Sequence, residues 1–278
     1  MIEIFHDISH QCSSITTKRY SSSFSRAIRM LHKDLREPIC DVYGFVRFAD
    51  EIVDTFHDYD KSALLALFKE ETYRAIDTGI SLNPILNSFR ITVNKYGIDR
   101  QLIAAFFESM EMDLGKQTYD KSGYEKYIYG SAESVGLMCL YIFCDGNKGM
   151  YEKLRPYAQA LGAAFQKINF LRDLKADHEQ LNRIYFPGVN FNNFSEEDKR
   201  TIEADIDADL KKSYEGILML PVKARFGVYL AYRYYLSLFN KIRRSKPSLL
   251  MQSRVRINNT LKAFIFLRAG LRNSLNIL

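Results

Sequence analysis

Helical periodicity runs along almost the whole chain, and hardly any segment alternates apolar and polar residues with a period of two. The clearest example is the apolar set Val42, Phe45, Val46, Ala49 and Val53. Its spacing of three and four residues predicts one long, largely buried helix with Pro38 in the first turn. A chain of this kind folds by packing helices against one another.

Residues that begin and end helices recur between the apolar stripes. Asn83 and Pro84 open a predicted helix that Gly97 closes. Asp99 caps the next predicted helix, which ends at Gly115. These signals predict short connections between successive helices.

The second half of the chain continues the pattern. We expect one helix that follows Ser122 and Gly123 and runs to Cys144, and another over 151–175. The segment 182–200 is rich in Asn, Gly and Pro and predicts a loop, after which helices resume at Glu203. Because no repeat, low-complexity tract or linker interrupts the chain, we expect one all-α domain over residues 1–278.

The composition agrees with a folded, mainly helical domain. Of the 278 residues, 47% are apolar and 26% charged, so the chain can bury a substantial core, which excludes intrinsic disorder. Fourteen glycines and six prolines are few for a turn-rich β-sandwich. The cysteines Cys12, Cys40, Cys139 and Cys144 form no CxxC pair, so we expect free thiols rather than disulfides or a zinc site.

No segment is predicted to cross a membrane. The first residues lack the basic start and apolar block of a secretory signal. The longest uninterrupted apolar run, over 135–144, is shorter than the roughly 18 residues that a spanning helix needs. We therefore expect a cytoplasmic protein without a C-terminal membrane anchor.

The excess positive charge is modest and gathers late in the chain. The 39 Lys plus Arg against 33 Asp plus Glu give a net charge of +6. The late basic residues are Lys241, Arg243, Arg244, Lys246, Arg254, Arg256, Lys262, Arg268 and Arg272. A solvated helix face explains them, and so does contact with a phosphorylated ligand or with anionic headgroups at the inner membrane surface. Only the overall charge suggests nucleic acid, so we expect no nucleic-acid partner.

Two acidic pairs stand apart from the other carboxylates in their surroundings. Asp50 and Asp54 are four residues apart in GFVRFADEIVD, and Asp173 and Asp177 are four apart after AAFQKINFLR. This spacing puts both members of a pair on one helix face. Carboxylates on a mostly buried helix are costly unless a positive group meets them.

Two explanations satisfy these carboxylates. One is an internal salt bridge, for which Arg47 or Arg172 is at hand. The other is a divalent metal cluster, because Mg²⁺ prefers carboxylate oxygens together with substrate phosphates. Arg47 lies one turn before Asp50, and Asn169 lies one turn before Asp173. Two such helices, facing each other, could hold metal ions against a diphosphate whose outer oxygens meet the arginines.

Five segments of the chain resemble the squalene and phytoene synthase family. They are SSSF at 21–24, YGFVRFADEIVD at 43–54, MDLGKQTY at 112–119, YIYGSAESVG at 127–136, and LGAAFQKINFLRDLKAD followed by RIYFP within 161–187. The resemblance runs from about residue 20 to about residue 262, and the combination of NFLRDLKAD and RIYFP is its most specific part.

The resemblance implies an isoprenoid-synthase-like helical bundle around a central cavity, with two aspartate motifs that bind Mg²⁺, or Mn²⁺ in its place, at the mouth. The metal ligands it implies are Asp50, Asp54, Asp173, Asp177 and Asn169. The substrate contacts it implies are Ser21, Ser23, Phe24, Arg47, Arg172, Arg183 and Arg254. Tyr127 and Tyr235 match tyrosines that lie near the leaving diphosphate in relatives. The four aspartates and these two tyrosines are the catalytic residues that the resemblance predicts.

Three positions depart from the family pattern. Ser22 replaces the lysine of a usual Ser-Lys-Ser-Phe motif, which puts one basic phosphate contact in doubt. A usual Asp-Asp pair becomes Asp50-Glu51, which keeps the charge. Glu133 stands where a glycine is common, and it either places a carboxylate near the cavity or changes a helix packing contact.

The activity implied by the resemblance is head-to-head condensation of two prenyl diphosphates through a cyclopropyl diphosphate. The chain looks more like the bacterial carotenoid enzymes, so we expect two geranylgeranyl diphosphates to give phytoene. Ile28 favours this longer substrate because it is smaller than an aromatic plug. The alternative is two farnesyl diphosphates giving dehydrosqualene or squalene.

Two further alternatives stay open. No GxGxxG follows a strand, so no Rossmann unit is expected, but reductive members of the family bind NADPH without one. A non-catalytic assembly or interaction relative is the alternative of another class, although it should have eroded aspartate motifs. The sequence does not specify the oligomeric state.

Overall fold

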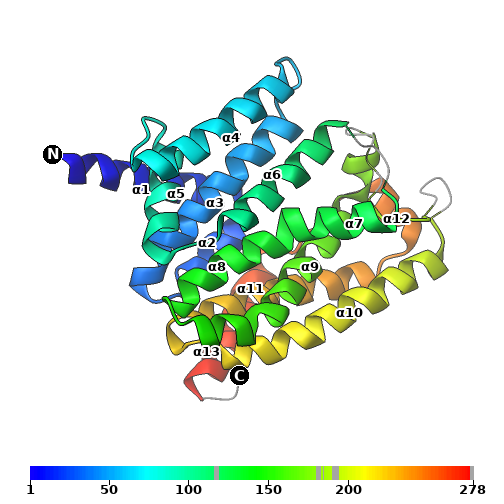
Figure 1. Ribbon diagram of the computed structural model, residues 1–278. Helices are drawn as coiled ribbons and strands as arrows, with labels where there is room; N and C mark the ends of the chain where they lie inside the picture. The colour runs from blue at the N-terminus through cyan, green and yellow to red at the C-terminus, as the bar shows by residue number, and fades with distance from the viewer. Residues whose placement is uncertain (116–118, 180–182, 184, 190–193, 276–278) are drawn as a thin grey trace.

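The computed structural model describes residues 1–115, 119–179, 183, 185–189 and 194–275. These residues form helices and their connections, without a strand, which confirms the predicted all-α fold (Figure 1). The helices are α1 (Ile2–Tyr20), α2 (Ser22–Ile28), α3 (Lys33–Asp54), α4 (Lys61–Thr78), α5 (Pro84–Tyr96), α6 (Arg100–Gly115), α7 (Lys121–Ile128), the π-helical turn η1 (Tyr129–Glu133), α8 (Ser134–Cys144), α9 (Lys148–Glu179), α10 (Glu196–Met219), α11 (Val222–Arg243), α12 (Pro247–Gln252) and α13 (Asn259–Ser274).

Two clusters of buried side chains hold the bundle together. One cluster joins α3, α4, α5, α6 and α8, and within it the ring of Phe45 stacks on that of Phe89 at a centroid distance of 3.9 Å. The other joins α7, α9, α10 and α11 with the inner side of α13. The predicted apolar stripe of α3 is confirmed, since Phe45, Ala49 and Val53 are all buried.

Several helix ends follow the sequence signals. The side chain of Asn83 accepts hydrogen bonds from the backbone N–H groups at the start of α5, and Gly97 ends that helix with φ 64°. The Asp99 carboxylate accepts from the N–H of Gln101 at 2.8 Å. Both predicted caps are therefore confirmed.

Two predicted helix starts are wrong. Helix α3 begins at Lys33, so Pro38 lies inside it rather than in its first turn. The carbonyl that loses its partner belongs to Asp34, an exposed residue, where water can replace the bond. Helix α7 begins at Lys121, because Asp120 is the N-cap and its carboxylate accepts from the N–H of Gly123.

The predicted loop over 182–200 extends too far. Helix α10 begins at Glu196, where Ser195 and Asp198 form a capping box in which each side chain accepts from the other residue's N–H. Helix α9 covers Lys148–Glu179 and is therefore longer at both ends than its predicted range of 151–175.

Close backbone packing surrounds the π-helical turn η1. A Cβ atom on Gly130 would run into the carbonyl oxygen of Ala105 on α6. A Cβ atom on Gly162 of α9 would lie 2.7 Å from the carbonyl oxygen of Ala132. These two glycines let α6 and α9 approach η1 from either side, which fixes the side chains that η1 directs inward.

The stretch Lys121–Cys144 is long and apolar enough to cross a bilayer by length and composition alone. Half of its apolar window is buried inside the bundle, where Leu137, Met138 and Ile142 are core residues. A position in the core accounts for this hydropathy. Cys139 also lies on this stretch, and all four cysteines are free thiols.

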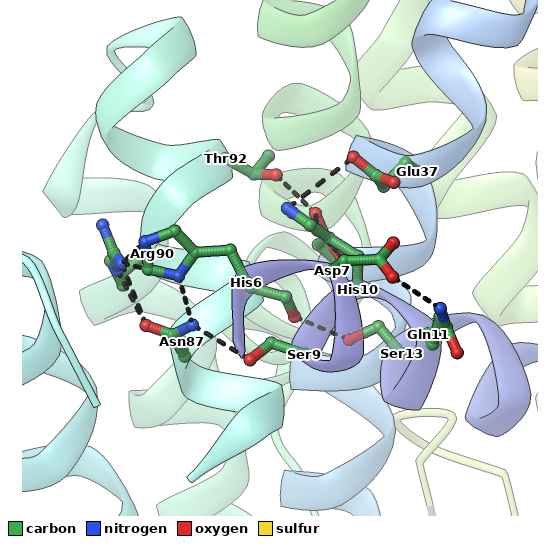
Figure 2. A network of polar contacts seen from close by, with 12 residues as sticks. His6, Asp7, Ser9, His10, Gln11, Ser13, Glu37, Asn87, Arg90 and Thr92 are labelled. Atoms are coloured by element: carbon green, nitrogen blue, oxygen red, sulfur yellow. Dashed lines mark hydrogen bonds and ion pairs between the residues drawn. The ribbon is translucent and has the colours of Figure 1, made fainter. Parts of the chain in front are cut away.

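A buried polar network attaches the N-terminal helix to the bundle (Figure 2). The Asp41 carboxylate on α3 is fully buried, lies 2.9 Å from His10 Nδ1 on α1, and accepts from Thr92 Oγ1 on α5 at 2.7 Å. Burial alone would lower the pKa of His10, but the hydrogen bond to Asp41 and the charges of Asp41 and Glu37 raise it. The ring is therefore suited to carry the positive charge that Asp41 needs.

Replacing His10 by leucine is expected to lower the free energy of unfolding at pH 6 by up to about 3 kcal/mol, an upper limit because burial already raises the pKa of Asp41 with His10 in place. Without its cation, Asp41 must hold a proton there, about two units above its ordinary pKa of 3.8, at about 1.4 kcal/mol per unit. The deficit should shrink as the pH falls toward 4, because a raised folded-state pKa costs stability only above the unfolded value. Urea denaturation at several pH values measures it.

The double variant His10→Leu/Asp41→Leu is the matched control for this experiment. Replacing both members by apolar groups removes the stranded charge, so it should recover much of the lost stability. Equal stability of wild type and His10→Leu at pH 6 would contradict this account of how α1 is held.

Candidate active site

A cavity of about 620 Å³ lies in the middle of the bundle. Its walls are apolar for most of their extent, with side chains from α2, α3, α8, α9 and α11 such as Ile28, Val42, Leu140, Leu161 and Val228. Charged side chains line the same cavity near the C-terminal ends of α3 and α6. The cavity therefore combines an apolar interior with a charged region that we call the charged mouth.

The charged mouth is built from carboxylates and guanidinium groups in equal number among the described residues. They are Asp50, Asp54, Asp113 and Asp173 with Arg47, Arg172, Arg183 and Arg254. Asp50 and Asp54 come from α3 and Asp173 comes from α9, so the structure brings both predicted aspartate motifs to one cavity. Above about pH 7, where all four carboxylates are ionised, the two signs balance, so a multiply charged anion entering this site needs additional cations.

Arg183 connects the first aspartate motif to a carboxylate on α6. Its Nη1 atom lies 2.7 Å from Asp54 Oδ1, and its Nε atom lies 3.5 Å from Asp113 Oδ1. The same guanidinium donates to the carbonyl oxygens of Val53 and Asp113. Arg183 is buried, and these carboxylates raise the pKa of its guanidinium.

Asp113 is the most deeply buried carboxylate of the mouth. Its side chain is 3% exposed and accepts hydrogen bonds from Tyr127 Oη at 2.8 Å and Tyr185 Oη at 3.3 Å. Burial raises its pKa to about 7, although the charge of Arg183 opposes the shift. Burial and the neighbouring Asp54 charge likewise raise the pKa of Asp50 to about 7.

The second aspartate motif is held by two arginines. Arg172 Nε donates to Asp173 at 3.0 Å, and Arg254 Nε lies 2.6 Å from the same carboxylate. One turn earlier on α9, Asn169 Oδ1 accepts from Tyr235 Oη at 3.1 Å. The predicted residues Arg172 and Arg254 therefore meet at Asp173, while Asn169 lines the same cavity and contacts Tyr235.

Arg47 has a buried hydrogen-bond donor without a partner. It pairs with Glu51, lies 4.0 Å from Asp50 Oδ2 and stacks over the Tyr20 ring at 4.3 Å. Its Nε atom is buried without a hydrogen-bond partner. Since buried donors are rarely left unpaired, this atom is available to an anionic ligand at the mouth.

Aromatic rings cover the charged mouth from two directions. Phe170 stacks on Tyr185 at 3.9 Å, and Tyr127 lies beside both rings. Phe165 stacks on Tyr235 at 3.8 Å, with Phe24 tilted against both. Aromatic faces of this kind exclude water and attract cations.

Two predicted site residues are not placed at the cavity. Ser23 is not among the residues that line it, whereas Ser21 lines it and caps α2 by accepting from the N–H of Phe24. The side chain of Asp177 lies outside the described residues, although its backbone belongs to α9. Glu133 accepts from Gln159 Nε2 at 2.8 Å and does not line the cavity, which favours the packing interpretation of that position.

Two functional candidates escaped the sequence analysis. Asp113 is a single acid without a partner at helical spacing. Two signals could have marked it: its place on α6 one turn after the buried Met110, and its place in the segment MDLGKQTY that carries the family resemblance. Lys262 on α13 donates to Ser22 Oγ at 2.9 Å, so it brings a cation to the position where the family pattern has a lysine.

The donor set fits a hard divalent ion that completes its shell with substrate and water. Among the described side chains, no three carboxylate, imidazole or thiolate groups converge closely enough to hold an ion alone. Mg²⁺ usually binds through one or two carboxylates, several waters and phosphate oxygens. Asp50 fits this role because burial and the neighbouring Asp54 charge raise its pKa, and a bound cation would offset both effects.

The sequence matches the squalene/phytoene synthase family over residues 17–260. A 4,4'-diapophytoene synthase of Staphylococcus haemolyticus is 27% identical over 190 residues, which are 68% of this chain and 65% of the relative. A presqualene diphosphate synthase of Rhodopseudomonas palustris is 28% identical over 60% of this chain and 58% of its own length. The chain thus matches less than two thirds of either relative. A phytoene synthase of Arthrospira platensis is 24% identical over 84% of both chains.

Solved structures share the architecture. A dehydrosqualene synthase in complex with a ligand superposes with a TM-score of 0.83 at 19% identity, covering 97% of this chain and 98% of that one. A squalene synthase from Alicyclobacillus acidocaldarius gives a TM-score of 0.74 at 21% identity, covering 87% and 95%. At these identities the likeness shows the fold.

Proposed function

The chain belongs to the squalene/phytoene synthase family, and on that premise we propose that it condenses two prenyl diphosphates head to head through a cyclopropyl diphosphate. The observation that carries the proposal is one apolar cavity ending in a charged mouth to which α3, α6 and α9 all contribute. The apolar part suits prenyl chains, and the arginines and aspartates suit diphosphates together with cations.

We propose Mg²⁺, with Mn²⁺ as a substitute, as the metal of this site. Asp50, Asp54 and Asp173 would hold it together with the diphosphate, and Asn169 is the further ligand proposed on α9. When bound, the metal supplies Lewis-acid stabilisation of the departing diphosphate. Balanced charge at the mouth supports a metal requirement, since the arginines alone only offset the aspartates.

The side chains of the mouth would redistribute their contacts when substrate enters. Arg172, Arg183 and Arg254 now neutralise aspartates, and the same guanidinium groups can turn toward phosphate oxygens once a cation meets the carboxylates. Arg47 has a free Nε donor for the same purpose. Tyr127 and Tyr235 hold their hydroxyls at the mouth through Asp113 and Asn169. The surrounding rings keep water from an allylic cation.

The pH dependence of the metal requirement follows from Asp50. Because its pKa is about 7, protons compete with Mg²⁺ for this carboxylate below neutrality. Lowering the pH from 8 to 6 should raise the Mg²⁺ concentration for half-maximal activity by about tenfold, because the ionised fraction of a carboxyl group with this pKa falls by about that factor. Mg²⁺ titrations at both pH values measure this shift, and an unchanged requirement would contradict the role of Asp50.

We propose two geranylgeranyl diphosphates as the substrates and phytoene as the product, with two farnesyl diphosphates as the alternative. Ile28 supports the longer chain, since it lines the cavity wall one turn beyond Phe24 and leaves room that an aromatic ring would fill. The relatives named 4,4'-diapophytoene synthase and phytoene synthase are similarly distant, at 27% and 24% identity, so they do not separate the two substrates.

Replacing Ile28 by phenylalanine should shift the preference toward farnesyl diphosphate. The larger ring shortens the apolar cavity, and losing room for even a few methylene groups changes kcat/KM by about 10- to 200-fold. Competition between the two substrates, followed by product chromatography, gives the ratio. Ile28→Val, which leaves the cavity open, is the control, and equal ratios for all three proteins would refute this use of Ile28.

The enzyme proposal is tested by incubating the protein with Mg²⁺ and each diphosphate separately. We expect diphosphate release and a hydrocarbon product, and parallel reactions with and without NADPH show whether the product is reduced. Absence of diphosphate release from both substrates would defeat the proposal and favour a non-catalytic relative of the family.

A further inference from the structure

Helix α13 presents an unusual outer face to solvent. Its side chains Leu261, Phe264, Leu267 and Leu271 are 38%, 59%, 63% and 66% exposed. Phe264, Leu267 and Leu271 share one side of the helix, Leu261 lies at the edge of that side, and Ile265 and Ala269 on the other side are buried toward the bundle. We call the four exposed side chains the α13 face. The helix is therefore apolar on the side that packs and on the side that does not.

The segment of the chain that carries this face has charge of one sign only. No Asp or Glu follows Glu215, and the last 63 residues contain 12 of the 39 basic residues. The first 215 residues carry 27 basic and 33 acidic side chains, so the whole positive excess lies in the C-terminal part. On α13 itself, Arg268 is exposed beside the apolar stripe.

The exposed apolar side chains and the positive charge together indicate what kind of partner binds this face. A second copy of the chain would bring the same positive charge against this one, and nucleic acid would leave the apolar face unused. An anionic bilayer satisfies both features, because apolar side chains enter the acyl boundary while basic side chains meet headgroup phosphates. We propose that the α13 face is a docking surface for anionic lipid bilayers.

A second group of exposed apolar side chains lacks this charge pattern. Phe48, Phe56 and Leu67 border a shallow groove on α3 and α4, but Glu51 and Glu71 line the same groove. Acidic side chains at that position are repelled by an anionic surface. The choice of α13 thus follows from charge as well as exposure.

Docking through α13 would set the cavity mouth close to the bilayer. The start of the helix is tied to α2 by the hydrogen bond from Lys262 to Ser22, next to the cavity-lining Ser21. Arg254, shortly before α13, is paired with Asp173 at the mouth itself. An apolar ligand of the cavity would then have a short path to the lipid. Docking is independent of the proposed reaction, so its test uses no substrate.

Flotation of the full-length protein with vesicles tests the proposal. We expect binding to vesicles of phosphatidylcholine with phosphatidylglycerol, weaker binding to phosphatidylcholine alone, and release by high salt. Replacing Phe264, Leu267 and Leu271 together by serine should weaken partitioning to the anionic vesicles about tenfold or more. Arg268→Gln should weaken it less, by roughly the several-fold loss expected for one basic side chain.

The matched control replaces three comparably exposed apolar residues elsewhere, Ile4, Ile15 and Leu82, by serine. Circular dichroism verifies that both triple variants are folded. Wild-type flotation of the control together with loss in the α13 variant supports the proposal. Recovery of wild-type protein only in the unbound fraction, equal flotation of wild type and α13 variant, or equal loss in both triple variants would overturn it.

Discussion

Replacing Asp50 and Asp173 together by asparagine is expected to lower kcat/KM by about 10³-fold or more, since removing metal-held charge stabilisation costs several kcal/mol of transition-state binding. Each substitution keeps the shape of the side chain and removes its charge. One residue comes from α3 and the other from α9, so the double variant tests both motifs. Steady-state release of diphosphate measures the loss.

Lost stability at Asp50 should not explain that drop, and denaturant titration of the double variant checks the contribution of Asp173, whose carboxylate pairs with Arg172 and Arg254. The raised pKa of Asp50 means that its charged form opposes folding, so an asparagine there should leave the free energy of unfolding unchanged or higher at pH 8. Asp205→Asn is a suitable control, because that carboxylate is exposed and pairs with Lys167, away from the cavity. Near wild-type activity of the double variant would refute the proposed roles of both aspartates.

Replacing Arg183 by methionine is expected to lower both stability and activity. The guanidinium is the cation that links Asp54 and the buried Asp113, so its removal strands a carboxylate and should cost about 3–5 kcal/mol of unfolding free energy. Loss of a phosphate-directed charge and of the ordered Asp54 should lower kcat/KM by about 10²-fold as well.

Two further variants separate these effects. Arg183→Met/Asp113→Asn removes the stranded charge and should recover much of the stability while activity stays low. Arg183→Lys keeps the positive charge but not the planar set of guanidinium donors, and it should be intermediate in both measurements. Denaturant titration and kinetics on all three proteins provide the comparison, and a fully stable Arg183→Met protein would contradict the linking role.

The sequence was most informative where a signal is local. The spacing of Asp50 and Asp54 on an apolar helix predicted that they share a face, and both line the cavity. The Asn83 cap and the Gly97 end of α5 were equally local and are confirmed. The capping box of Ser195 and Asp198 is a local signal too, and it starts α10 at Glu196 rather than at the predicted Glu203.

The contacts that the sequence did not predict join residues that lie far apart along the chain. Asp113 is an ordinary acid in the sequence, and its importance comes from Tyr127, Tyr185 and Arg183, which meet it only in the folded bundle. Arg183 lies outside any helix, so periodicity could not direct it toward Asp54, and only the family resemblance did. The sequence alone does not show that the α13 face is exposed, because an apolar stripe has the same pattern whether it packs against the bundle or faces solvent.

The measurement that tests the central claim most directly is Mg²⁺-dependent binding of inorganic diphosphate to the wild-type protein and to Asp50→Asn/Asp173→Asn, by titration calorimetry at pH 8. We predict that the wild type binds diphosphate only when Mg²⁺ is present, and that the double variant loses this Mg²⁺ dependence together with most of the affinity. Equally tight, Mg²⁺-dependent binding by both proteins would contradict the claim that these aspartates hold the metal and diphosphate across the cavity.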